Sequence, residues 1–412
     1  MTRVLSALLF AIPLLSVVQV PAPVCAAEEV VEVRAGQPCW ILRSNRVEVA
    51  VTKLGGHMAP VTFETGSKKP IRPYYVSPWH EEKLDLDVPV LKPLRGDFFC
   101  MPFGGNAAAY QGESHPPHGE VAGSPWTFVS LETGKTADGR PRHTLTLSLQ
   151  TKVRPGKVTK RVTLVDDENV VYTQHIVEGF RGPTPVAHHA TLAMPESPRS
   201  IHIVTSPFRF GMTNPTLFSD PEKREYQALE IGAKFTDLAS VPVNQTGAPP
   251  ADLRAFPDRR GFADLIALVN DPQGNDPAWT TAYNSEAGSL WFSLKDPALL
   301  PTTLFWIENH GRHGSPWNGR NNCLGLEDVC ADFAEGLVPS IEPNPLSKEG
   351  VKTVHTLSGD KPFVVNYIQG AVPAGAKVAK IGFSKGAMAV QTEDGKTLAV
   401  PVRHEFLKTG EL

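Results

Sequence analysis

The sequence predicts an all-β protein, a large antiparallel β-sandwich, and three observations support this fold class. The chain of 412 residues contains 38 Pro and 34 Gly, which interrupt it every few residues. Between these breaks lie short runs rich in Val, Ile, Thr and Phe, the residues that favour strands. In residues 143–153, HTLTLSLQTKV, leucine alternates with polar neighbours, which is the period-two pattern of a half-buried strand. We therefore expect packed antiparallel sheets with polar loops gathered on one concave face.

Strand-like runs continue to the C-terminus, whereas sequence compatible with a helix is scarce. The later runs include NVVYTQHIVEG, SIHIVTS, SLWFSL, TTLFWIEN, FVVNYIQG and KTLAVPV. The best helix candidate is EKREYQALEIGAKFTDLA, residues 222–239, within a Pro-flanked region from about 211 to 262 that has the character of an insertion. No repeat of fixed period occurs. The sequence thus predicts one sandwich domain over residues 28–412 that carries this insertion.

Residues 1–27 have the pattern of a secretory signal peptide. Arg3 supplies the positive start, residues 4–20 form an apolar run, and the small residues Ala26 and Ala27 follow. Two prolines interrupt or end the run, while a membrane anchor needs about 20 consecutive apolar residues. We expect cleavage after Ala26 or Ala27, which would leave a soluble protein in the periplasm or outside the cell, without a membrane association.

Charge and cysteine content narrow the function classes. The net charge is -3, and removing the signal peptide, which contains Arg3 and no acid, takes it to -4. This near balance gives no electrostatic reason to expect nucleic acid as a partner. Too few cysteines remain in the mature chain to form a disulfide framework. Cys323 and Cys330 are either a disulfide pair or two small buried apolar residues.

The segment from Arg95 to Trp126 gathers groups that are costly to order unless they have a role. It contains His115 and His118 among several Gly, Pro and Phe residues. So much Gly and Pro is incompatible with a helix, and the aromatic content argues against a disordered linker. Polar side chains beside aromatic rings on a shaped loop are typical of a small-molecule site.

Three further features carry groups suited to chemistry. In the run VAHHATLAMPE, His188 and His189 are adjacent in a predicted strand, so only one of them can face a given cleft. In CLGLEDVC, Glu327 lies in an otherwise apolar strand, where burial beside a partner would raise its pKa toward that of a useful base. A Gly-rich loop at residues 308–322 adds Trp317 and Arg320 as candidate contacts of a ligand.

Several of these motifs, in this order, resemble the aldose 1-epimerase (mutarotase) superfamily, including its hexose-6-phosphate epimerase-like branch. They are RG followed by CMPFG and PHG with Trp126 seven residues later, the run LGGHMAPVTF near residue 54, HHATLAMP, and LGLED. The resemblance covers most of residues 45–335. It implies the galactose mutarotase-like supersandwich fold, a carbohydrate as small-molecule partner, and interconversion of sugar anomers.

The resemblance also implies a role for individual residues. Arg95 would match the substrate-binding Arg of the family, His118 its HG histidine, His189 its central histidine and Glu327 its catalytic base. The reaction itself requires such groups, since a proton leaves the anomeric hydroxyl while another is added to the ring oxygen. We expect Glu327 as the base and His189 as the acid.

Further groups are expected to hold the sugar. His118 and Arg95 would bind its oxygens and stabilise developing charge. Trp126 or Trp317 would stack on the apolar face of the ring, and His188 and Arg320 are further candidates for substrate contact.

Two other function classes fit the same residues. His115, His118, His189 and Glu327 could form a metal site of three His and one carboxylate. Alternatively the protein could be a secreted carbohydrate-binding sandwich without catalysis. No phosphate loop, dinucleotide fingerprint or Cys-rich metal cluster occurs in the sequence, so we predict activity without a cofactor.

Overall fold

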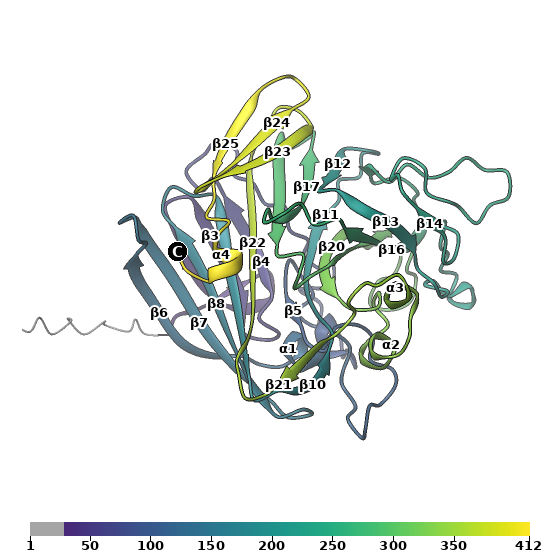
Figure 1. Cartoon of the computed structure of the whole chain (residues 1–412), viewed down its shortest axis with the longest axis horizontal. Helices are drawn as coiled ribbons and strands as arrows, with labels where there is room; N and C mark the ends of the chain where they lie inside the picture. Colours follow the sequence, from purple (N-terminus) through teal and green to yellow (C-terminus); the bar gives the residue numbers. More distant parts are fainter. Residues whose placement is uncertain (1–28) are drawn as a thin grey trace, which may run out of the picture.

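A computed structural model describes residues 29–412, and the expected signal peptide lies outside these described residues. Almost all regular structure is strand, and every pairing between named strands is antiparallel. Within the described part of the chain, two large sheets dominate and three smaller sheets lie around them (Figure 1). The all-β sandwich predicted from the sequence is confirmed.

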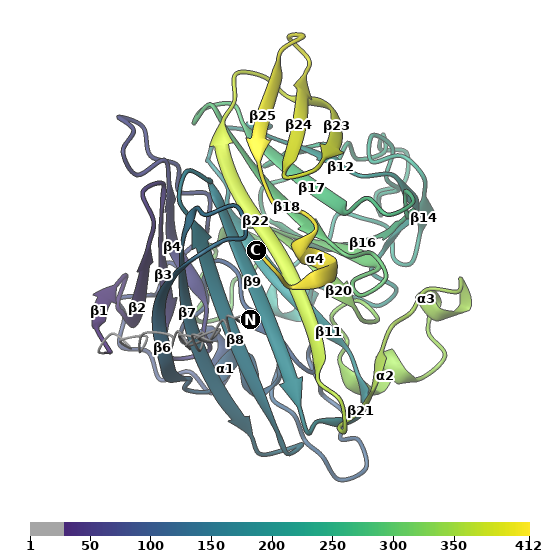
Figure 2. The same ribbon diagram turned by 60° about the vertical axis from the view of Figure 1, so that its left-hand side comes forward.

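The larger of the two main sheets has nine strands, and Figure 2 shows its strands β6 to β9 and β22 running side by side. Across the sheet they are β15 (Ala255–Phe256), β12 (Ile201–Thr205), β17 (Ala278–Asn284), β18 (Ser289–Lys295), β22 (Phe363–Pro373), β9 (Val170–Glu178), β8 (Gly156–Val165), β7 (Pro141–Thr151) and β6 (Thr127–Lys135).

The second main sheet has seven strands and carries the candidate site described below. In order across the sheet they are β14 (Lys234–Phe235), β13 (Phe208–Thr213), β16 (Phe262–Asn270), β19 (Thr302–Asn309), β20 (Asn322–Cys330), β11 (Val186–Ala193) and β5 (Phe99–Cys100).

The remaining elements are short. The smaller sheets are β1 (Val31–Arg34), β2 (Gln37–Arg43), β3 (Val47–Thr52) and β4 (Met58–Phe63); β10 (Arg181–Thr184) with β21 (His355–Ser358); and β23 (Val378–Ser384), β24 (Ala387–Thr392) and β25 (Thr397–Pro401). The helices are α1 (Gly119–Gly123), α2 (Leu337–Ile341), α3 (Pro345–Lys348) and α4 (Phe406–Thr409), with single 3₁₀ turns at η1 (Pro89–Leu91) and η2 (Pro221–Lys223). No helix among the described residues is long and apolar enough to cross a membrane.

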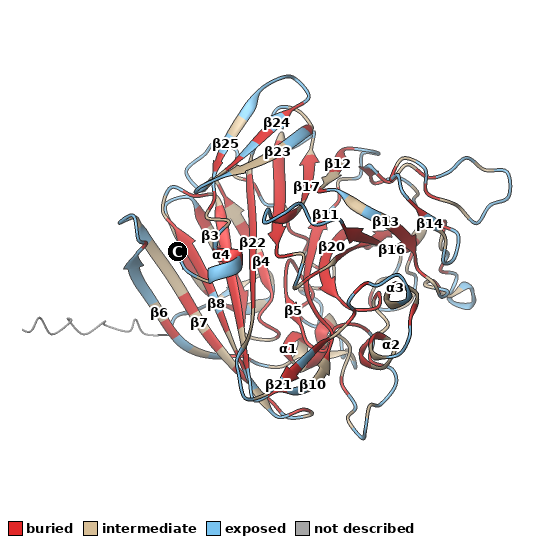
Figure 3. Cartoon of the chain, in the orientation of Figure 1, coloured by how far each residue is buried: buried red, intermediate tan, exposed pale blue. Residues whose placement is uncertain are grey.

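The two main sheets differ in whether one or both of their faces are buried, and this difference explains the pattern of apolar residues in their strands. Strand β7 alternates buried and less buried residues toward its C-terminal half, as expected for a sheet with one face in the core. Strands β19 and β20 are buried almost without interruption, and Figure 3 shows β20 in red. One face of the seven-stranded sheet packs in the sandwich core, and the other face packs in a second apolar cluster with residues 75–103 and 331–351. That second face holds the candidate site.

The last part of the chain packs on the outside of the nine-stranded sheet. Apolar side chains of β23 to β25 and α4 form a third cluster with residues of β9, β18 and β22 that face away from the sandwich core. In Figure 1 these C-terminal strands lie at the top of the molecule. Strands β23 to β25 and helix α4 therefore cover a sheet face that would otherwise expose apolar side chains to water.

The helix expected over residues 222–239 is wrong. This stretch contains only η2 and the short strand β14, and it runs as an irregular loop between β13 and β16. The carboxylate of Asp264 on β16 accepts hydrogen bonds from the backbone N–H groups of Ala228 and Leu229, at 3.0 to 3.2 Å. A long-range partner thus satisfies donors that a helix would have satisfied locally.

The structure also decides between the two interpretations of the cysteines. Cys323 and Cys330 lie seven residues apart on β20, and both thiols are free and buried. Seven residues of extended strand span roughly 23 Å, whereas a disulfide requires Cα atoms within about 7 Å. A pair between these two cysteines is therefore ruled out, and both act as small buried side chains.

Candidate active site

Two neighbouring strands of the seven-stranded sheet bring an acid and a base into contact. His189 on β11 is directly opposite Glu327 on β20 in the antiparallel register. Side chains directly opposite each other project from the same face of a sheet. The Nε2 atom of His189 lies 3.2 Å from Oε1 of Glu327, and both side chains are more than nine-tenths buried. The two residues are 138 positions apart in the chain, and the strand register brings them together.

The adjacent histidine faces the opposite way, as the strand period requires. His188 is fully buried in the sandwich interior, where its Nδ1 lies 3.0 Å from Oδ2 of Asp97. Its ring stacks on Tyr367 of β22 with 4.1 Å between the ring centroids. His188 therefore belongs to the interface between the two sheets and does not line the cavity beside His189.

His118 reaches the same place from the loop that precedes α1. It adopts a left-handed backbone conformation, with φ of 60°, and its ring lies 5.2 Å from that of His189 between centroids. A Cβ atom on the next residue, Gly119, would approach the carbonyl oxygen of Met101 to 2.0 Å. The HG pair in the sequence thus has a steric cause, since only glycine permits the close approach that places His118.

Aromatic stacking and one hydrogen bond fix the orientation of the His189 ring. The ring lies parallel to Phe98 at 4.4 Å between centroids, and the other face of this Phe stacks on His57 at 4.0 Å. The Nδ1 atom of His189 lies 3.1 Å from the hydroxyl of Thr191. When Nδ1–H donates to that hydroxyl, Nε2 presents its lone pair toward Glu327.

A glycine on the same strand makes room for the carboxylate. Gly325 precedes Glu327 by two residues and so shares its face. An added Cβ atom at Gly325 would lie 2.8 Å from Oε1 of Glu327 and 3.0 Å from Cβ of Trp306 on β19. Any larger residue would push the carboxylate or the indole out of its position.

Burial governs the protonation of the three polar groups. It raises the pKa of Glu327 to about 8, and the nearby charge of Asp328 adds to the increase. Burial lowers the pKa of His118 to about 4 and that of His189 well below its ordinary value, with the neighbouring His118 contributing. Near neutral pH the contact between Glu327 and His189 therefore holds one proton, and its favoured position is the carboxyl group.

These side chains open into a cavity of about 250 Å³. Its wall is mostly apolar, and its titratable side chains are His118, His189, Glu327 and Arg312, to which Trp306 adds a buried indole N–H without a partner. The remaining lining residues are Val88, Val90, Leu91, Leu94, Pro117, Phe218, Leu265, Trp306, Trp317 and Ala334. A cavity of this kind, with few convergent polar groups and a carboxyl of perturbed pKa, is the usual form of a small-molecule site.

Arg312 is held between aromatic rings beside the cavity. Its guanidinium lies 5.1 Å from the centroid of Phe218 and 5.4 Å from that of Trp317. Its Nε atom lies 3.2 Å from Oε2 of Glu308, whose pKa burial raises to about 7. Since Phe218 comes from the 211–262 region, that region contributes to the wall of the cavity.

Arg95 does not line the cavity, although the sequence suggested it as a substrate-binding residue. It is completely buried, and burial lowers its pKa to about 10. Its guanidinium donates to the carbonyl oxygens of Pro93, Arg34 and Ala35 at 2.9, 3.1 and 3.0 Å. Arg95 thus fastens the turn between β1 and β2 to the loop that leads into β5.

Two other expected contacts also lie elsewhere, while one is in place. Trp126 is buried in the core, and its Nε1–H donates to the carbonyl oxygen of Val121 at 3.0 Å. Arg320 forms an ion pair with Glu82, at 2.9 Å between Nη2 and Oε2. Trp317 does line the cavity, where its ring meets that of Trp306 edge to face at 6.0 Å.

The four groups of the alternative metal site are not brought together. The Nε2 atom of His115 lies 3.2 Å from Oε2 of Glu113, and His115 does not line the cavity. Over residues 29–412, no group of three or more His, Cys, Asp or Glu side chains is arranged to hold a metal ion. The donor set therefore does not fit the three-His, one-carboxylate geometry.

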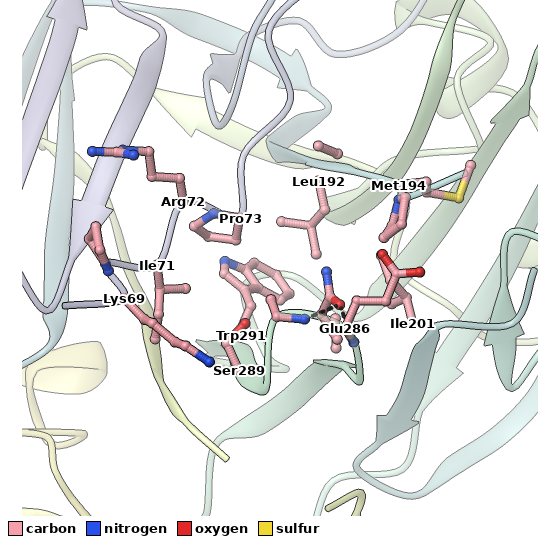
Figure 4. Close-up of a pocket in the computed structure, with 16 residues that line it drawn as sticks. Lys69, Ile71, Arg72, Pro73, Leu192, Met194, Ile201, Glu286, Ser289 and Trp291 are labelled. Atoms are coloured by element: carbon pink, nitrogen blue, oxygen red, sulfur yellow. Dashed lines mark hydrogen bonds between the residues drawn. The ribbon is translucent and has the colours of Figure 1, made fainter. Parts of the chain in front are cut away.

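A larger cavity of about 520 Å³ lies at another place, where β11 ends beside β17 and β18. Figure 4 shows Trp291 at its centre, Pro73 and Leu192 on one side, and Glu286 on another. Among the described residues that line it, Glu286 is the only one with a carboxylate, and none is a histidine. The described residues that line this cavity include no paired acid and base, so the smaller cavity is the candidate active site.

Several residues of the site escaped the sequence analysis. The sequence does contain a signal for Trp306. Side chains alternate along a strand, so in the run TTLFWIEN Trp306 shares a face with the acid Glu308. Val90, Leu94 and Leu265 had no such signal, since apolar residues that line a cavity look like core residues in the sequence.

Comparison with known proteins supports the fold. No family model and no curated protein matches the sequence. Among solved structures, a mutarotase candidate from Salmonella typhimurium aligns with a TM-score of 0.53 at 12% identity, covering 85% of this chain and 97% of that one. An aldose 1-epimerase candidate from Escherichia coli K12 aligns with a TM-score of 0.52 at 14% identity, covering 82% and 99%. An aldose 1-epimerase candidate from Klebsiella pneumoniae aligns with a TM-score of 0.53 at 13% identity, covering 82% of this chain and 80% of that one. The chain thus has the fold of mutarotase-like proteins.

Proposed function

We propose that this protein is an exported aldose 1-epimerase-like isomerase that interconverts sugar anomers by acid–base ring opening, without a cofactor. The observation that carries the proposal is the contact of 3.2 Å between His189 and Glu327, buried at the wall of a cavity suited in size to a monosaccharide. The mutarotase-like fold supports the same reaction class by analogy.

The closeness of the two groups matches the geometry of the reaction. Ring opening takes a proton from O1 and adds one to the ring oxygen O5, and both oxygens are bonded to C1. Two neighbouring oxygens can therefore be reached by an acid and a base that are also neighbours. A pair in direct contact can serve them from one side of the sugar, so the ring need not lie between the two side chains.

The proton balance closes over a full cycle. In the opening step Glu327 gives its proton to O5 while Nε2 of His189 takes the proton of O1, so that the C1–O5 bond breaks and C1 becomes an aldehyde. After rotation about the C1–C2 bond, O5 attacks the other face of C1. Glu327 then recovers the proton from O5 and His189 returns a proton to O1, which restores the starting pair.

This assignment exchanges the roles that the sequence suggested for the two residues. A buried carboxyl with a pKa of about 8 is mostly protonated near neutral pH and is ready to act as the acid. A buried imidazole with a lowered pKa is neutral and is ready to act as the base. Each group is then already in the protonation state that its first step requires.

The other residues of the cavity would bind the sugar. In our proposal His118, neutral and beside His189, forms a hydrogen bond with a substrate oxygen and stabilises its developing charge. Trp317 and Trp306 offer apolar surface to the C–H groups of the ring.

Single substitutions at the pair test the proposal. His189→Asn should lower kcat by about 10² to 10⁴ while KM changes little, because the proton transfer is made in the transition state. The assay is polarimetry of freshly dissolved α-glucose and α-galactose, corrected for the spontaneous reaction. His143→Asn on β7, outside the cavity, is the matched control and should keep the wild-type rate. Sugar binding without any acceleration by the wild type would instead indicate a carbohydrate-binding protein.

A further inference from the structure

The polar and apolar groups of the catalytic cavity are unevenly distributed. His118, His189 and Glu327 form one contiguous cluster through the contacts described above. Much of the remaining wall is aliphatic and comes from two places, the segment around η1 with Val90 and Leu94, and Leu265 of β16. These aliphatic side chains are themselves more than nine-tenths buried, so they are fixed parts of the wall.

An ordinary hexose does not suit such a wall. Besides O1 and O5, it carries four hydroxyl groups that lose their bonds to water when they are buried. For these four hydroxyls the cavity offers His118, Arg312 and the indole N–H groups of Trp306 and Trp317, and the Trp306 N–H has no partner within the protein. A hydroxyl that meets an aliphatic wall instead keeps no hydrogen bond and is disfavoured there.

The C6 hydroxyl is the one whose loss fits best. Removing it leaves the ring hydroxyls and the chemistry at C1 and O5 unchanged, and it turns the one group that projects beyond the ring into a methyl. A methyl packed against leucine and valine gains contact, whereas a pentose, with only hydrogen at that position, would leave a void.

We propose that the substrate of this site is a 6-deoxyhexose, an aldose with a methyl group in place of the hydroxymethyl group. This inference rests on the proposed aldose 1-epimerase-like function and specifies its substrate class. An apolar pocket rejects an added hydroxyl by up to about a hundredfold, and a missing methyl-sized group costs between about 10 and 200-fold. We expect kcat/KM for the 6-deoxyhexose to exceed that of the hexose, and that of the pentose, by at least about tenfold.

Matched sugars that differ only at C6 provide the test. One series is 6-deoxy-D-galactose, D-galactose and L-arabinose, which share the configuration of the ring. A second is 6-deoxy-D-glucose, D-glucose and D-xylose, and the mirror-image sugars of both series are measured in parallel. The proposal expects the 6-deoxy sugar to be the best substrate within the most active series. A hexose or pentose that is equal or better there overturns it, while acceleration of no sugar overturns the proposed function itself.

Substitutions in the aliphatic wall add an independent test. Leu94→Asn and Leu265→Asn each introduce an amide that can form a hydrogen bond with a substrate hydroxyl. Leu94→Met and Leu265→Met are the matched controls, because they keep an apolar wall of similar size. The ratio of kcat/KM for the 6-deoxyhexose to that of its hexose should fall at least tenfold in one of the Asn variants and stay within about threefold in the Met variants. This ratio does not depend on the folded fraction of the preparation, because both sugars meet the same active molecules. An unchanged ratio in both Asn variants would contradict the inference.

Discussion

Glu327→Gln should stabilise the folded protein at neutral and alkaline pH while it removes the acid. The pKa of Glu327 rises from an ordinary 4.5 to about 8 on folding, because the carboxyl is buried. A group with a raised folded pKa contributes stability that is complete below its unfolded pKa and is lost as the pH rises through the folded value. Each pH unit between these two values costs about 1.4 kcal/mol. Glutamine has a similar shape and does not ionise, so the variant escapes this loss.

The magnitude follows from the interval between the two pKa values. From pH 5 to pH 8 the free energy of unfolding of the wild type should fall relative to that of Glu327→Gln by on the order of 3 kcal/mol. The assay is urea unfolding of both proteins at pH 5, 6, 7 and 8, followed by tryptophan fluorescence. Other titrating groups are common to both proteins and cancel in the difference. If the difference is the same at pH 5 and pH 8, the carboxyl is not held protonated and the reasoning fails.

Three further predictions concern the rate and the stability. The value of kcat/KM should fall as the pH rises through about 8, since Glu327 must be protonated to act as the acid; a rise over the same range in a pH–rate profile would return it to the role of base. Gly325→Ala should lower kcat at least tenfold with an unchanged circular dichroism spectrum, because the added Cβ would lie 2.8 Å from the carboxylate; a wild-type rate would show that the carboxylate has no fixed position. Arg95→Met should lower the free energy of unfolding by about 3 kcal/mol, since it removes three hydrogen bonds to carbonyl oxygens, yet leave KM unchanged; urea unfolding and steady-state kinetics separate the two effects.

The sequence predicted those parts of the site that depend on local pattern. Glu327 stood out as an acid in an apolar strand, and the adjacent histidines had to face opposite sides of their strand because side chains alternate. The motif resemblance selected His189, and the strand register then explains why it meets Glu327.

Features set by distant parts of the chain could not be predicted in this way. Arg95 resembled a binding residue because of the loop around it, but two of its three carbonyl partners belong to a turn about 60 residues earlier. The helix expected over residues 222–239 had adequate local propensity, which hydrogen bonds to Asp264 override. Which apolar side chains line the cavity likewise depends on which sheet face they cover, and that is decided by the packing of the whole chain.

Optical rotation measured on fresh α-anomers tests the central claim most directly. The wild type and Glu327→Gln are compared at pH 7 with each of the matched sugars, against the spontaneous rate. If the buried contact between His189 and Glu327 moves the protons, the wild type accelerates the approach to anomeric equilibrium for at least one aldose and Glu327→Gln loses at least a hundredfold in kcat. A rate for the variant within about twofold of the wild type, well short of the tenfold that about 1.4 kcal/mol represents, would contradict the account.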